Sequence, residues 1–129
     1  MAPELTILSY AAMLQFAQLS LTILFSDAQT GISYGAGPRD IPQKLTGLAG
    51  RLDRALTNHY AALLLFTIAV LVITLGGKSG PLTITCAWIY LIARMAYVPA
   101  YVSGIPYLRS AIWTIATGAT LTMLAVALI

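Results

Sequence analysis

The chain has 129 residues, of which 59% are hydrophobic and only 9% are charged, and its formal net charge is +3. Soluble domains carry about 25% charged residues, so this composition excludes an ordinary soluble protein. The seven Lys and Arg residues are scattered and form no run, which argues against nucleic-acid binding. The composition therefore predicts a single integral membrane domain over residues 1–129.

The first predicted membrane span covers residues 5–25. Its N-terminal flank lacks the positive charge of a signal peptide, so we expect the span to be retained. Gln15 and Gln18 lie in its middle on one face, and amides at bilayer depth need partners, so this face should contact other helices. A polar segment rich in glycine and proline follows at residues 27–50 and predicts a long first loop.

The second predicted span, residues 50–75, opens with a polar stripe. At about 100° per residue on a helix, Arg51, Arg54 and Asn58 share one face. Two cations and an amide entering a membrane helix are costly, so a functional role is the default expectation. The stripe is therefore the first candidate site.

The third and fourth predicted spans cover residues 82–101 and 107–129. Spacings of four, three and four residues align four polar side chains on one face of the third span: Tyr90, Arg94, Tyr97 and Tyr101. The fourth span contains no charge after Arg109, near its start. Glycine and proline mark short turns at residues 76–81 and 103–106.

Four helices with one long and two short connections predict an all-α bundle with up-down-up-down topology. Five of the seven Lys and Arg residues belong to the side of the first and third connections, and Lys78 marks the other side. By the positive-inside rule, the long first loop should be cytoplasmic and both termini should lie on the opposite side. The candidate residues at the cytoplasmic ends of the last three spans then lie at similar depth.

The positive charge at this depth exceeds the nearby negative charge. Asp40 and Asp53 are the only nearby acids, and Asp53 points to the other side of its helix. Arginine binds carboxylates and phosphates with a forked pair of hydrogen bonds, so the surplus predicts an anionic ligand. Ordinary roles compete: Arg51 and Arg109 can extend to lipid phosphates, and interfacial tyrosines such as Tyr101 can form an aromatic belt.

Other chemistry finds little support in the sequence. His59 lies away from the Arg54 face and is better explained as a packed histidine, and Cys86 as an inert buried thiol. One histidine, one cysteine and dispersed acids make no set of metal ligands, so no metal site is expected. No Ser-His-Asp or phosphate-loop pattern is present.

The pattern RxxRAxxN over residues 51–58, followed by an apolar run, resembles the second-helix signature of the MAPEG family. These are membrane-associated proteins of eicosanoid and glutathione metabolism. The segment YLIARMAYVPAYVSGIPYLRS, residues 90–110, is similar to the family's third-helix tyrosine run and the arginine that opens its fourth helix. The resemblance covers all four spans and is nearest to the small bacterial branch.

The resemblance implies a homotrimer in a bacterial inner membrane, with glutathione bound as a co-substrate between subunits near the cytoplasmic face. It implies that Arg51, Arg54 and Asn58 hold the tripeptide, that Tyr97 and Tyr101 add hydrogen bonds, and that Arg109 stabilises the thiolate. A free thiol has a pKa of about 8.5, which an adjacent guanidinium lowers. The implied activity is a glutathione transferase or peroxidase acting on lipophilic electrophiles from the membrane lipid.

One position departs from the family pattern. Glutathione-using members usually carry a glutamate three residues after the asparagine, where this chain has Ala61. This leaves room for another anionic ligand and for a non-catalytic binding or scaffold protein that keeps the pocket. A small transporter is a third alternative, but drug/proton antiporters of this size need an acid within the first span, and Glu4 precedes it.

Overall fold

The computed structural model describes all 129 residues and contains helices and connections but no strand. Four helices are long: α1 (Pro3–Thr30), α3 (Gly47–Leu75), α4 (Pro81–Ser103) and α5 (Leu108–Leu128). The fifth, α2 (Ile32–Ala36), is a single short turn of helix between α1 and α3. The predicted all-α fold is confirmed.

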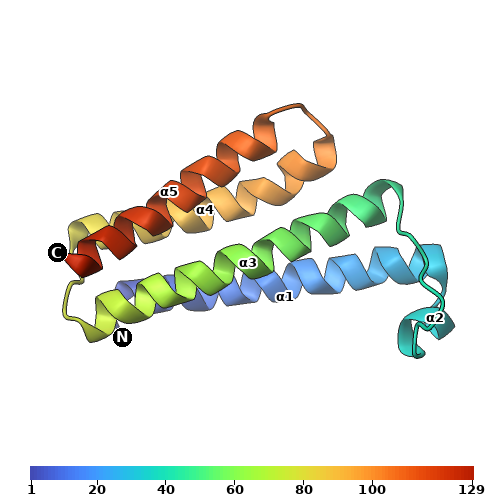
Figure 1. The fold of residues 1–129 in the computed structure, drawn as a ribbon, viewed down its shortest axis with the longest axis horizontal. Helices are drawn as coiled ribbons and strands as arrows, with labels where there is room; N and C mark the ends of the chain where they lie inside the picture. Colours follow the sequence, from blue (N-terminus) through green and yellow to red (C-terminus); the bar gives the residue numbers. More distant parts are fainter.

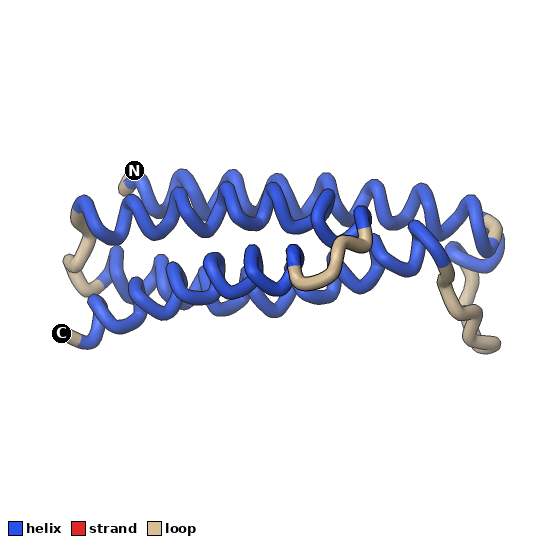
Figure 2. Tube along the Cα trace, turned by 90° about the horizontal axis from the view of Figure 1, so that it is seen from above, coloured by secondary structure: helices blue, strands red, loops and turns tan.

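The four long helices lie lengthwise against one another, with α1 beside α3 and α4 beside α5 (Figure 1). Both termini and the α3–α4 turn lie at one end of the bundle, and the other two connections lie toward the opposite end (Figures 1 and 2). We call these the terminal end and the loop end. All four helices are long and apolar enough to cross a membrane, and their exposed Leu, Ile and Trp side chains suit contact with lipid. The protein is therefore an integral membrane protein.

The first connection differs from the predicted loop at residues 27–50. Helix α1 continues to Thr30 and α2 follows after Gly31, so the long irregular stretch covers residues 37–46. The Gln29 amide explains part of this order, because its Nε2 donates to the Thr46 carbonyl at 3.0 Å and its Oε1 accepts from the Thr46 amide at 2.8 Å. This pairing ties the end of α1 to the start of α3.

The apolar core lies between the middle of the bundle and the terminal end. Phe66 of α3 stacks on Tyr90 of α4 with ring centroids 3.9 Å apart, and Ile7, Ile73 and Met123 are fully buried around them. Each buried side chain of this size stabilises the fold by about 1.5–3 kcal/mol. Buried polar side chains lie both toward the loop end and at the terminal end.

A buried carboxylate fastens the terminal end. The Glu4 side chain is fully buried; it accepts a hydrogen bond from Ser79 Oγ at 2.9 Å and one from Thr83 Oγ1 at 2.8 Å. Thr83 lies in the first turn of α4, where the helix dipole favours a negative charge. Glu4 therefore links the start of α1 to the start of α4 and is part of the structure rather than a free acid.

We expect Glu4→Ala to lower the free energy of unfolding by about 1–3 kcal/mol, because Ser79 and Thr83 lose their acceptor. Thermal unfolding in detergent micelles measures the change. The exposed carboxylate of Asp40 provides the control, and Asp40→Asn should stay within about 0.5 kcal/mol of the wild type. Equal stability of Glu4→Ala and the wild type would show that the buried contact contributes nothing.

Candidate functional site

A cavity of about 340 Å³ opens at the loop end, where the start of α3, the end of α4 and the start of α5 meet. We call it the cationic cavity. Three of its lining residues are arginines and none is acidic; the lining is Arg51, Arg54, Ala100, Tyr101, Gly104, Ile105, Pro106, Tyr107, Arg109 and Ser110. Such a surface attracts anions.

Arg51 lies against the turn that ends α4. Its Nη1 donates to the Val102 carbonyl at 2.8 Å, one of the carbonyls left without a helical partner at a helix C-terminus. Gly104 has a φ of +71°, and a Cβ at that position would lie 3.2 Å from Arg51 Nη1. Glycine thus permits both the left-handed turn and the close approach of the guanidinium. Arg51 is anchored, with its remaining donors free.

Tyr101 stands between the other two arginines of the cavity. Arg54 Nε donates to the Tyr101 hydroxyl oxygen at 3.0 Å. The guanidinium carbon of Arg109 lies 5.1 Å from the centroid of the Tyr101 ring, within the range of a cation–π contact. Because the hydroxyl oxygen accepts from Arg54, its own proton stays available to a ligand.

Asn58 and Tyr97, which share the predicted faces, do not line this cavity. They surround Arg94, whose side chain is 0% exposed inside the bundle. Arg94 Nη1 donates to Asn58 Oδ1 at 2.9 Å, and its guanidinium carbon lies 4.2 Å from the centroid of the Tyr97 ring. Of the six predicted site residues, the structure therefore brings four to the cationic cavity and places two around a buried arginine.

The buried cluster also contains His59, the packed histidine of the sequence analysis. Its Nδ1 accepts from Arg94 Nε at 3.3 Å and lies 3.5 Å from Gln18 Nε2. Arg94 Nη2 and His59 Nε2 have no hydrogen-bond partner, and no carboxylate hydrogen-bonds Arg94. Arg94 is the residue that the sequence analysis left outside the site, although its position on the tyrosine face was a signal. It supports the residues behind the cavity.

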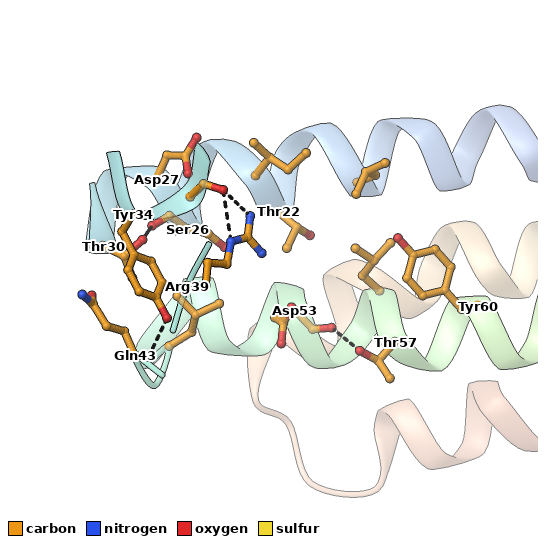
Figure 3. A pocket seen from close by; sticks show the side chains of 15 residues that line it. Thr22, Ser26, Asp27, Thr30, Tyr34, Arg39, Gln43, Asp53, Thr57 and Tyr60 are labelled. Atoms are coloured by element: carbon orange, nitrogen blue, oxygen red, sulfur yellow. Dashed lines mark hydrogen bonds between the residues drawn. The ribbon is translucent and has the colours of Figure 1, made fainter. Parts of the chain in front are cut away.

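A second cavity, of about 410 Å³, lies between α1, α2 and α3 at the same end of the bundle (Figure 3). We call it the acidic cavity because its lining includes Asp27 and Asp53, against the single cation Arg39. Arg39 donates from Nε and Nη2 to the Gly35 carbonyl, at 3.1 and 2.7 Å. Sequence analysis placed Asp53 on the opposite side from Arg54 but did not foresee this cavity, which depends on how the first connection folds.

A comparison with models of protein families gives a match. The model of the MAPEG family matches residues 7–129, nearly the whole chain. No curated protein matches the chain.

Proposed function

Because this chain belongs to the MAPEG family, we propose that it binds glutathione at the cationic cavity and transfers its sulfur to lipophilic electrophiles. The observation that supports this proposal is the presence of three arginines and no acid in one cavity of a membrane protein. A guanidinium without an ionic partner at membrane depth costs free energy unless an anion pairs with it. Glutathione has two carboxylates and, when ionised, a thiolate, which match the three cations.

The proposed roles follow the positions of the side chains. Arg51 and Arg54 hold the tripeptide carboxylates, and Tyr101 donates its free hydroxyl proton to the bound peptide. The Arg109 guanidinium hydrogen-bonds to no other group of the chain, which suits the role of thiolate partner. Asn58 and Tyr97 would act through their contacts with Arg94 unless binding turns them toward the cavity.

The transfer balances without an added cofactor. The thiol gives its proton to water, and the thiolate sulfur attacks the electrophilic carbon of an aryl halide. A carbon–sulfur bond forms as the carbon–halogen bond breaks, and the halide leaves with the electron pair. With a lipid hydroperoxide, two glutathione molecules are oxidised to the disulfide while the hydroperoxide is reduced to an alcohol and water.

We also propose the assembly and location that the family resemblance implies. Three copies would form a homotrimer in a bacterial inner membrane, with the loop end in the cytoplasm and both termini on the opposite side. The cationic residues of the loop end support this orientation. They are one lysine and four arginines: Lys44, Arg39, Arg51, Arg54 and Arg109.

Titration calorimetry in detergent tests the binding step. We expect wild-type protein to bind glutathione, and Arg54→Ala to bind it about 10- to 100-fold more weakly, because a charge-assisted hydrogen bond is lost. Arg54→Lys should recover part of the loss. Lys78→Ala, which removes a cation at the opposite end, is the matched control and should bind like the wild type.

A non-catalytic binding protein is the second candidate, favoured by Ala61, which removes the acid that glutathione-using relatives carry at this position. Turnover separates the two candidates. Conjugation of 1-chloro-2,4-dinitrobenzene or reduction of a lipid hydroperoxide above the uncatalysed rate supports the enzyme. Glutathione binding without turnover supports the binding protein, and absence of binding removes the glutathione proposal.

A further inference from the structure

Two kinds of side chain line the cationic cavity. The arginines of α3 and α5 give it its charge, and the proposed function uses all of them. The turn between α4 and α5 adds Ile105, Pro106 and Tyr107, to which the proposed function gives no role. This turn carries no charge over residues 103–108 and lies at the loop end (Figure 1). The cavity therefore has an apolar border beside its charged lining.

Tyr107 holds a backbone conformation that is unusual for its residue type. Its φ is +66° and its ψ is −14°, which lies in the left-handed region. Residues with a Cβ disfavour this region because the Cβ comes too close to a carbonyl oxygen, and a bulky side chain is rare there. The backbone is therefore strained at a residue that lines the cavity.

The fold does not require a tyrosine at this position. Tyr107 is the N-cap of α5, but its side chain makes no capping hydrogen bond. Its carbonyl accepts from the Ala111 amide at 3.0 Å, a bond that any residue could supply. Asparagine would suit both the cap and the left-handed conformation. Because the Tyr107 side chain is 86% exposed, it also adds little to the packing of the chain.

An aromatic belt at the membrane surface is the ordinary explanation for an exposed tyrosine. A belt residue needs only the right depth, so an unstrained neighbour such as Ile105 could fill that role as well. Strained residues, in contrast, are concentrated at ligand sites. The combination of strain, exposure and a place in the cavity lining favours contact with a ligand.

The shape of the side chain indicates what it would bind. Of the three turn residues in the lining, only Tyr107 presents a flat aromatic face. Aromatic rings attract one another in offset-stacked arrangements, which an aliphatic chain cannot form. Tyr107 and Arg109 line the same cavity, so a ring resting on Tyr107 is brought near the proposed thiolate partner.

We propose that Tyr107 is the platform on which the lipophilic reactant stacks, and that this reactant is a planar aromatic electrophile such as a nitro-substituted aryl halide. This inference rests on the proposed function and names its second substrate. The substitution itself is unchanged: a carbon–sulfur bond forms, and the halide leaves with the electron pair. Tyr107 exchanges neither protons nor electrons and acts only on the affinity for the ring.

Titration calorimetry with two glutathione conjugates tests the platform without turnover. Wild-type protein should bind S-(2,4-dinitrophenyl)glutathione about 3- to 10-fold more tightly than S-hexylglutathione, whose substituent is not planar. Tyr107→Leu keeps an apolar side chain but removes the ring, so it should abolish this preference, whereas Tyr107→Phe should keep it. Tyr60→Leu is the matched control, because Tyr60 is an exposed tyrosine that lines the acidic cavity instead.

Thermal unfolding in detergent micelles tests the strain. Tyr107→Asn should unfold at a temperature a few degrees above that of the wild type, because asparagine relieves the conformation and caps α5. The same variant should lose the preference for the dinitrophenyl conjugate. A gain in stability together with a loss of affinity is typical of a residue that serves a ligand rather than the fold. A Tyr107→Asn protein less stable than the wild type would show that the ring supports the fold and would overturn the platform.

The binding results separate the platform from the proposed function. If wild-type protein binds both conjugates equally, or if the preference survives in Tyr107→Leu, the platform is overturned while the glutathione site stands. If wild-type protein binds neither conjugate nor glutathione itself, the platform and the proposed function are both overturned.

Discussion

Replacing Arg109 by alanine should lower kcat/KM for glutathione conjugation by about 100- to 1000-fold, the range found when one preorganised donor is removed from developing negative charge. The proposed reason is loss of the only cavity guanidinium that hydrogen-bonds to no other group of the chain. Arg109→Lys keeps a cation but loses the planar pair of donors, so its kcat/KM should lie between those of Arg109→Ala and the wild type. The measurement is the rate of thioether formation from 1-chloro-2,4-dinitrobenzene at saturating glutathione and at limiting glutathione.

Two comparisons make this result specific to Arg109. Lys78→Ala, at the terminal end, should retain the wild-type rate. Glutathione affinity in Arg109→Ala should change far less than the rate, because Arg51 and Arg54 still hold the carboxylates. Equal rates for Arg109→Ala and the wild type would remove Arg109 from the proposed mechanism.

Replacing Arg94 by alanine should lower the free energy of unfolding by about 3–5 kcal/mol. The change deletes a large side chain that is 0% exposed, leaves Asn58 Oδ1 without its donor and leaves His59 Nδ1 with only the Gln18 amide as a donor. Thermal unfolding in detergent micelles measures it. Arg94→Met fills most of the volume without a charge, so its free energy of unfolding should fall by less. The difference between the two variants measures the cost of the empty space that alanine leaves.

Activity gives this prediction a second measurement. Because Asn58 and Tyr97 contact Arg94 rather than the cavity, Arg94→Met should disturb glutathione binding less than Arg54→Ala does. An Arg94→Ala protein as stable as the wild type would show that the buried cluster does not support the fold.

The four spans and the shared face of Arg51 and Arg54 could be predicted because both depend on local patterns, apolar length and helical spacing. The gathering of Tyr101 and Arg109 near these arginines followed from chain reversal alone. The separation of Asn58 from the cavity could not be predicted. It depends on where the side chain of Arg94, from α4, packs against α3, because Arg94 hydrogen-bonds Asn58. The acidic cavity escaped prediction for a similar reason: Gln29 pairing with Thr46 folds the first connection back, and no periodicity encodes such a long-range contact.

The unequal lengths of the helices affect how molecules reach the cationic cavity. Helix α3 has 29 residues and α4 has 23, a difference of about 9 Å along the axis. Since both begin or end at the same α3–α4 turn, the taller pair α1 and α3 rises beyond the shorter pair at the loop end (Figure 1). In the proposed membrane placement, the arginines would lie on a ledge that faces the aqueous phase from above and the acyl chains from the side. In the proposed function, a water-soluble peptide and a fat-soluble reactant would meet on that ledge while each remains in its own solvent.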